Sequence, residues 1–207
     1  MTLATATSLL IVVATATGLG AAARPAEPPA SPSRTSTRGQ LLVATESLQD
    51  PRFAQTVIYM LRHDATGALG LVVNRPVGTL PLARLLESLG RDHEGASGEI
   101  RVHYGGPVES ERGFVLHSSE WMSEQSHMVH DGVAVTSDPS VFDALAHGGG
   151  PRRVLFAAGY AGWAPGQLDR EIEDGSWFAV NADAALIFDD DAGAKWERAT
   201  QRRRLTL

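Results

Sequence analysis

From Gly39 onward, short apolar runs alternate with turn residues, and this pattern predicts a protein built mainly from short β-strands. The run Arg153–Ala158 is almost entirely apolar, which predicts a strand in the middle of a sheet. Thr56–Arg62 and Gly67–Asn74 are separated by a short polar loop and are expected to pair as a hairpin. Proline cannot donate to a ladder, so Asn74-Arg75-Pro76 is expected to end the second of these strands. The other predicted strands are Leu41–Ala44, Ile100–Tyr104, Gly113–Ser118, Val129–Thr136, Trp177–Val180 and Ala185–Phe188.

Helical periodicity appears in four places between these runs. Four leucines fall at i, i+3, i+4 and i+7 after Pro81 and before Gly90, which predicts a helix with one core-facing stripe. These leucines are Leu82, Leu85, Leu86 and Leu89. A second helix is expected after Asp138 as N-cap, a third from Pro165 or Gly166 to about Gly175, and a last one over Ala192–Arg204. Hairpins with interspersed helices indicate an α+β fold.

The N-terminus differs in composition from the rest of the chain. Residues 1–23 carry no charged side chain, and the apolar core Leu9–Ala16 precedes small residues at Ala21–Ala23, as in a secretory signal peptide. Residues 24–38 are rich in Pro, Ser and Thr and are interpreted as a linker. A single folded domain is expected over residues 39–207. Export to the periplasm follows if the signal-like segment is real, and a cytoplasmic protein is the alternative.

Composition and charge exclude several classes of function. The 207 residues are 43% hydrophobic and 20% charged, which is ordinary for a globular protein, and the formal net charge is −6. Direct binding of nucleic acid is therefore not expected. Arg202–Arg204 is the one basic cluster, and its place at the end of a predicted helix explains it. The chain has no cysteine, which excludes disulfides, thiolate nucleophiles and Cys-ligated metals.

No established catalytic motif occurs in the chain: there is no G-x-S-x-G, H-E-x-x-H, P-loop or dinucleotide-binding glycine motif. His127 and His130 are spaced i, i+3 but lack a third ligand, so neither a metal nor a cofactor is predicted. His117 ends a predicted strand and is the candidate general base, against the simpler interpretation of a structural histidine. Asp169 or Glu171 would be its carboxylate partner, although a solvated helix face also explains these acids.

The most distinctive stretch is Gly159–Trp177, in which a predicted strand passes through a glycine-rich loop into a short helix. This order can hold an anion or a ligand close to the backbone, but any tight strand-to-helix connection also needs it. Two other strand ends carry Gly or Pro. If the three loops gather, they form a cleft. Its predicted lining is Asn74, Arg75, Gly105, Gly106, Gly162, Trp163, Gly166 and Gln167, with His117 as a further candidate.

Four phrases in this order resemble the bacterial YqgE/AlgH family. They are the segment Gly39–Pro76, YGGPV at Tyr104–Val108, GFVLHS at Gly113–Ser118 and GYAGWAPGQLDREI at Gly159–Ile172. The resemblance implies an α+β fold with a branched mixed β-sheet, a small barrel-like portion and surrounding helices. It implies no established biochemical activity, and one branch is named for a link to the regulation of alginate production.

Three hypotheses of function follow. The first is a non-catalytic module that binds a small molecule or a protein through the glycine-loop cleft. The second is an enzyme of unrecognised type, such as a hydrolase with His117 as base, which lacks an activated nucleophile. The third is a transcription-regulatory role, for which the acidic chain and the absence of a helix-turn-helix argue against direct operator binding. Membrane contact is expected only through the N-terminal segment, if that segment stays uncleaved.

Overall fold

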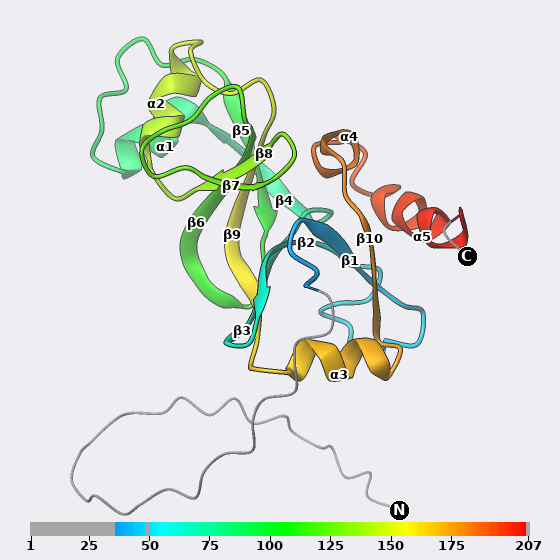
Figure 1. Ribbon diagram of the computed structural model, residues 1–207. Helices are drawn as coiled ribbons and strands as arrows, with labels where there is room; N and C mark the ends of the chain where they lie inside the picture. Colours follow the sequence, from blue (N-terminus) through cyan, green and yellow to red (C-terminus); the bar gives the residue numbers. More distant parts are fainter. Residues whose placement is uncertain (1–35, 49, 206–207) are drawn as a thin grey trace, which may run out of the picture. The chain divides into compact units, whose positions relative to one another are not determined.

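The computed structural model describes residues 36–48 and 50–205 (Figure 1). The signal-like segment and residues 24–35 of the predicted linker lie outside this range, so the predictions of export and of the domain boundary stay predictions. Antiparallel pairing joins four strands in the order β10, β1, β2 and β3. These strands are β10 (Trp177–Asn181), β1 (Gln40–Ala44), β2 (Val57–Asp64) and β3 (Gly67–Val72). The expected hairpin of β2 and β3 is confirmed.

Strand β9 (Val154–Trp163) is the branch point of the sheet (Figure 1). One edge pairs antiparallel with β6 (Val108–Ser118). The other edge pairs first with β5 (Glu99–Tyr104), parallel, and then with β3, antiparallel, from Ala161 to Trp163. The apolar run therefore does form a central strand, as predicted. It continues five residues beyond Ala158, so Gly159 and Gly162 are strand residues and not loop residues.

One predicted strand is wrong, and one observed strand was not predicted. Val129–Thr136 is not one strand but lies in the hairpin of β7 (His127–His130) and β8 (Val133–Thr136), because Gly132 adopts a positive φ of 74° and turns the chain. The chain also resumes as a strand directly after Arg75: β4 (Pro76–Pro81) pairs only with β5. Proline is tolerated there because it is the first residue of an edge strand.

Five helices are present in the part of the chain that the structure describes. The leucine-rich helix is α1 (Leu82–Ser88), and the others are α2 (Ser140–Ala146), α3 (Gln167–Glu173), α4 (Ala184–Ile187) and α5 (Lys195–Leu205). Helix α4 replaces the strand expected at Ala185–Phe188, because the Asp183 side chain accepts a hydrogen bond from Leu186 N at 2.7 Å and caps a helix. None of the described helices is long and apolar enough to cross a bilayer.

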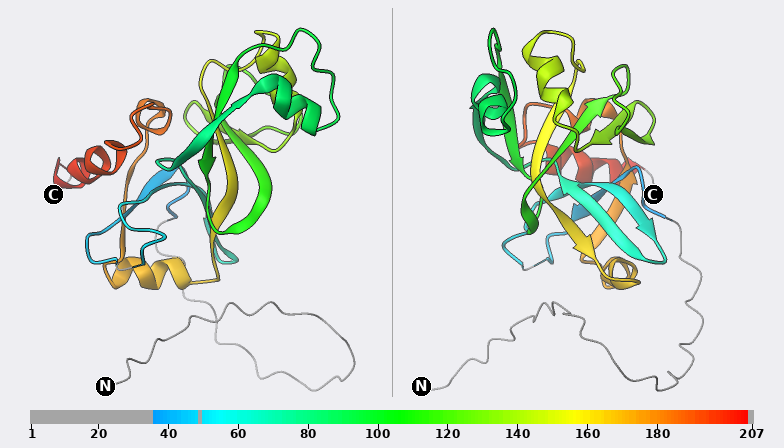
Figure 2. Two further views of the ribbon diagram at one scale, coloured as in Figure 1. Left: turned by 180° about the vertical axis from the view of Figure 1, so that it is seen from behind. Right: turned by 90° about the vertical axis from the view of Figure 1, so that its left-hand side faces the viewer.

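Successive side chains along each strand point to opposite faces of the sheet, so the sheet has a separate hydrophobic core on each face. Leu41 and Val43 pack on the face covered by α4 and α5, where Ala199 is fully buried. Leu42 and Ala44 pack on the opposite face, which α3 covers with Leu168 (Figure 2). A third cluster joins α1 and α2 to β5 and β6. The result is an α+β fold with a branched, mixed sheet that curls into part of a barrel, as expected.

Candidate functional site

The glycine-rich stretch at residues 159–177 forms a hydrogen-bonded clamp around one carboxylate. Trp163 and Trp177 each donate an indole N–H to the same oxygen, Glu171 Oε2, at 2.9 Å. Both tryptophans are buried, and their rings meet edge to face with centroids 6.1 Å apart. A carboxylate that accepts two N–H groups in this way fixes α3 to β9 and β10. Trp163 therefore has no free polar atom with which to bind a ligand.

The start of α3 is occupied by the same network. Gln167 donates through Nε2 to Glu171 Oε1 at 2.8 Å, and its Oε1 accepts the backbone N–H of Ala164 at 3.1 Å. Gly166 precedes the helix with a φ of 67°, in the left-handed region that glycine adopts without strain. The turn into α3 therefore explains why a glycine stands at 166 and a glutamine at 167, without a ligand.

Asn74 and Arg75 hold the loop before β2. The side-chain oxygen of Asn74 accepts from Val57 N and its amide donates to Gln55 O, both at 2.9 Å. Arg75 donates through Nη2 to Ala54 O at 2.8 Å. Both side chains thus satisfy backbone groups of a neighbouring loop, and Asn74 has used its oxygen and one amide proton.

Gly105 and Gly106 are required by close contact between backbones. A Cβ on Gly105 would lie 2.2 Å from Gly159 O, and one on Gly106 would lie 2.1 Å from the carbonyl carbon of Tyr160. Gly106 also has a φ of 151°. Both residues are buried, so their glycine character serves the junction of β5 with β9.

His117 is a structural histidine in this fold. It is fully buried, its Nδ1 lies 3.2 Å from Ser118 O, and its Nε2 lies 3.2 Å from Ser126 Oγ. Burial lowers its pKa. Its ring packs edge to face on Trp121 at 5.3 Å. Asp169, the carboxylate expected beside it, instead faces His63, with Oδ1 3.5 Å from Nε2.

The predicted cleft residues therefore lie at separate places along β9. His117 is opposite Val154, Gly105 donates its N–H to Ala158 O at 2.8 Å, and Trp163 ends the strand. At about 3.3 Å per strand residue, the first and last of these positions are about 30 Å apart. Asn74 and Arg75 join the middle group, because Tyr104 N donates to Arg75 O at 2.9 Å. Gly162 is an exposed strand residue near Trp163. The expected gathering of the three loops at one end is not found.

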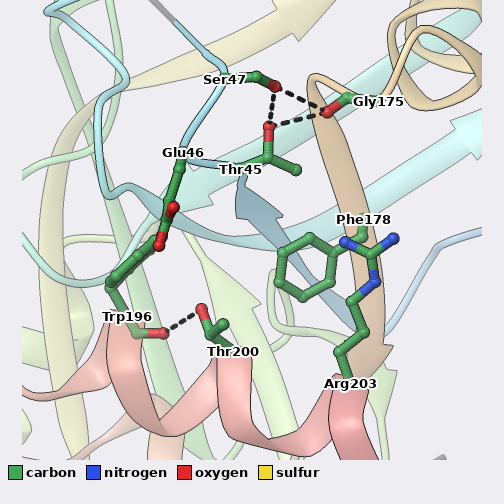
Figure 3. Close-up of a pocket in the computed structure, with 8 residues that line it drawn as sticks. All are labelled: Thr45, Glu46, Ser47, Gly175, Phe178, Trp196, Thr200 and Arg203. Carbon is green, nitrogen blue, oxygen red and sulfur yellow. Dashed lines mark hydrogen bonds between the residues drawn. The ribbon is translucent and has the colours of Figure 1, made fainter. Parts of the chain in front are cut away.

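A groove of about 440 Å³ lies between α5 and the turns that flank β1 and β10 (Figure 3). Its lining combines hydroxyls, aromatic rings and two opposite charges: Thr45, Glu46, Ser47, Gly175, Phe178, Trp196, Thr200 and Arg203. The hydroxyl of Thr45 donates to Gly175 O at 2.7 Å, which ties the two turns together. The indole N–H of Trp196 donates to Ala44 O at 2.8 Å and fixes the ring on β1. The walls of the groove are thus pre-formed.

The charged groups of the groove remain available. The guanidinium of Arg203 lies 4.6 Å from the centroid of the Phe178 ring (Figure 3). Neither Arg203 nor Glu46 forms an ion pair with another of the residues that the structure describes. A cation over an aromatic ring and a carboxylate beside a second aromatic residue can receive a ligand that carries both charges. Sequence reasoning missed this groove, because Arg203 looked like a charge that only complements the helix end.

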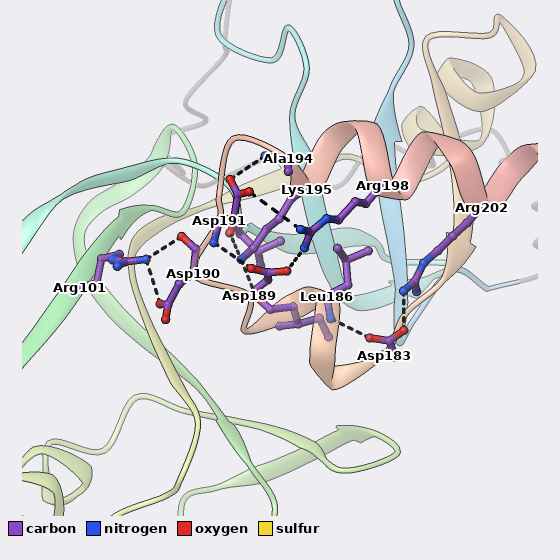
Figure 4. Close-up of polar contacts among 12 residues, drawn as sticks. Arg101, Asp183, Leu186, Asp189, Asp190, Asp191, Ala194, Lys195, Arg198 and Arg202 are labelled. Carbon is purple, nitrogen blue, oxygen red and sulfur yellow. Dashed lines mark hydrogen bonds and ion pairs between the residues drawn. The ribbon is translucent and has the colours of Figure 1, made fainter.

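A buried lysine begins helix α5. Lys195 is 1% exposed, and its Nζ donates to Val73 O at 2.8 Å and to Ile187 O at 2.7 Å. Burial is the main cause that lowers its pKa to about 8. Figure 4 shows the ion pairs around it, including Arg101 with Asp190. The lysine joins α5 to β3 and α4 and is not open to a ligand.

Burial also lowers the pKa of His103 to about 4, with the charge of Lys195 as a second cause. Its Nδ1 is buried and lacks a hydrogen-bond partner within the described part of the chain. No cluster of three or more His, Asp or Glu side chains that could hold a metal ion is found among residues 36–48 and 50–205.

Sequence relatives agree with this fold. The family model described as AlgH-like matches residues 41–207. A UPF0301 protein of Bradyrhizobium diazoefficiens is 42% identical over 172 residues, which cover 79% of this chain and 80% of the relative. A UPF0301 protein of Caulobacter vibrioides is 46% identical over 170 residues, which cover 81% and 87%.

Solved structures give the same result. The solution structure of the AlgH protein from Pseudomonas aeruginosa is similar with a TM-score of 0.68 and 38% identity, and the match covers 84% of this chain and 92% of that protein. A crystal structure of a protein from Corynebacterium diphtheriae has a TM-score of 0.65 at 18% identity, which shows a shared fold alone; it covers 83% and 89% of the two chains. The resemblance stated from the four phrases is confirmed, and this chain belongs to the AlgH-like family.

Proposed function

We propose that this protein is a binding module and that the groove between α5 and the turn at residues 45–47 is a non-catalytic binding site. The observation that supports this is the pair of charges, Arg203 and Glu46, which form no ion pair within residues 36–48 and 50–205 and flank Phe178 and Trp196. Side chains that only stabilise a fold are commonly satisfied inside it, as Glu171 is. An aromatic floor with a few polar groups is the usual composition of a ligand site.

The chemistry of the groove favours binding over reaction. Its hydroxyls bond to one another and to the backbone: Thr45 Oγ1 lies 2.7 Å from Ser47 Oγ, and Thr200 donates to Trp196 O at 2.8 Å. No histidine is among the lining residues, and no hydrogen bond within the described part of the chain joins the Glu46 carboxylate to a groove hydroxyl, so none of these hydroxyls is held by a base.

The expected ligand carries an anionic group for Arg203, a cationic group for Glu46 and an apolar part between them. Zwitterionic amino acids, short peptides and a peptide segment of a partner protein have this arrangement. A regulatory role through such a ligand or partner fits the groove. A net charge of −6 does not favour direct operator binding.

Titration of the full chain with free aromatic amino acids and dipeptides, followed by tryptophan fluorescence, tests the proposal. Trp196 lines the groove, so an occupied groove changes its emission. Arg203→Ala is expected to weaken binding about tenfold, because one charged contact of this kind contributes about 1–3 kcal/mol. Arg84→Ala, at an exposed position of α1, is the control that removes the same charge elsewhere. Equal affinity of both variants, or no response to any probe, would contradict the proposal.

A further inference from the structure

A second cavity, which shares no residue with the groove, holds a hydroxyl, an imidazole and a carboxylate in line. His63 is 6% exposed and stands between Thr37 and Asp169. Its Nδ1 lies 3.0 Å from Thr37 Oγ1, and its Nε2 lies 3.5 Å from Asp169 Oδ1. The two neighbours thus occupy the two opposite nitrogens of the ring. Nucleophile, base and orienting acid have this arrangement in enzymes that use an activated hydroxyl.

The hydrogen bonds define which nitrogen carries the proton. The backbone N–H of Thr37 points at His63 Nδ1 at 3.3 Å, so that nitrogen acts as an acceptor. The proton of the neutral ring then resides on Nε2 and faces Asp169. In this tautomer the one lone pair on Nδ1 is shared by the backbone N–H of Thr37, at 3.3 Å, and the Thr37 hydroxyl, which is closer at 3.0 Å. This is the state in which a histidine can take a proton from a hydroxyl.

The cavity gives these groups room for a small substrate. It measures about 410 Å³ and lies between α3 and the strands β1 and β10; its lining is Thr37, Gln40, His63, Asp169, Ile172, Glu173 and Ala179. Gln40 follows Thr37 on one turn, in which Gln40 N donates to Thr37 O at 2.9 Å. Its carboxamide has no hydrogen-bond partner in the part of the chain that the structure describes. A free amide N–H beside a nucleophile can stabilise an oxyanion.

The geometry points to an acyl-transfer site, at which Thr37 is the nucleophile, His63 the general base and Gln40 the oxyanion donor. Asp169 is a positioning residue, since it acts through His63. The expected substrates are short acyl esters that are neutral or cationic, because Asp169 and Glu173 place carboxylates at the rim and disfavour anions. Ile172 and Ala179 provide apolar contacts for the acyl group.

The reaction needs only the ester and water. Thr37 Oγ attacks the carbonyl carbon while its proton moves to His63 Nδ1. The bond from the carbonyl carbon to the alkoxy oxygen breaks, and the leaving oxygen takes that proton, which gives a free alcohol and an ester on Thr37. Water then attacks this ester, its proton passes through the same nitrogen to Thr37 Oγ, and a carboxylic acid is released.

Hydrolysis of p-nitrophenyl acetate and p-nitrophenyl butyrate by the purified full chain tests this site. Thr37→Val and His63→Gln are each expected to lower kcat about 100-fold or more, since a positioned base contributes at least that much. Thr37→Ser keeps the hydroxyl and is expected to retain turnover. Asp169→Asn is expected to lower kcat with little change in KM, which a merely structural effect on the cavity would not produce. Intact mass after an acid quench is expected to show one acyl group on the parent and none on Thr37→Val.

Exposed histidines can hydrolyse such esters slowly, so His127→Gln, at an exposed position of β7, is the control and is expected to match the parent. Thermal unfolding of each variant separates loss of the hydroxyl from loss of the fold. Turnover by Thr37→Val equal to that of the parent would overturn the assignment, and so would an absence of turnover in the parent. Neither outcome bears on the groove, because Arg203 and Glu46 are not in this cavity.

Discussion

The clamp at Glu171 and the groove at Arg203 contain the same kinds of side chain in opposite states. Each combines two aromatic residues with a carboxylate. In the clamp, both oxygens of Glu171 accept N–H groups, two of them from tryptophans. In the groove, Glu46 is exposed and the guanidinium of Arg203 lies over the Phe178 ring. The glycine and tryptophan residues that make the sequence distinctive thus maintain the fold, while the charged groups of the groove are residues that no pattern singled out.

Among the substitutions in the glycine and tryptophan motifs, Gly106→Ala should destabilise the fold most. The new Cβ would lie 2.1 Å from a backbone carbon of Tyr160, and backbone cannot give way as a flexible side chain can. We expect a loss of about 4 kcal/mol or more in the free energy of unfolding. Gly132→Ala is the control, since φ there is also positive but the space is open, and its cost should be about 1 kcal/mol. Urea unfolding compares the two; equal losses would contradict close packing at Gly106.

Glu171→Ala should have the next largest effect. It leaves the indole N–H groups of Trp163 and Trp177 without their acceptor, and hydrogen bonds to a charged group contribute about 1.5–3 kcal/mol each. We expect a loss of about 3 kcal/mol in stability. Glu46→Ala, the carboxylate of the groove, should change stability by less than about 0.5 kcal/mol. If both variants unfold at the same denaturant concentration, Glu171 contributes no more to stability than Glu46, and the structural role of the clamp is contradicted.

His103 should make the protein less stable in mild acid. Its pKa is lowered from 6.5 to about 4 in the folded state, so the unfolded chain binds the proton first as the pH falls. Its contribution is absent above pH 6.5, and by pH 5 the stability should have fallen by about 2 kcal/mol. His103→Gln should show a smaller loss between pH 7 and pH 5. His117, whose pKa is also lowered, acts in the same direction and is present in both proteins, so it cancels in the difference.

Local sequence patterns predict much of this fold. The leucine spacing finds α1, the apolar run finds β9, and the turn residues find the hairpin of β2 and β3. Patterns fail where one contact decides the outcome. A cap from Asp183 turns the apolar residues after it into α4, and pairing with β5 alone makes a strand of residues 76–81 despite two prolines.

The candidate sites were beyond such patterns for a physical reason. Thr45 and Arg203 meet because β10 pairs with β1 and α5 folds back on both, a contact between the two ends of the domain. His63 carries no local signal, since it occupies one alternating position in β2 and meets Asp169 only through the packing of α3. The glycine and tryptophan motif was visible because its backbone contacts restrict the residue type at each position.

Amide chemical shifts of the labelled full chain, measured during titration with aromatic dipeptides, test most directly whether the groove binds while the motif supports the fold. If the groove binds, the shifts are confined to residues 45–47, the turn at Gly175 and α5, and they are lost in Arg203→Ala. Shifts centred on Trp163 and Gln167, or on Asn74 and Gly106, would contradict it.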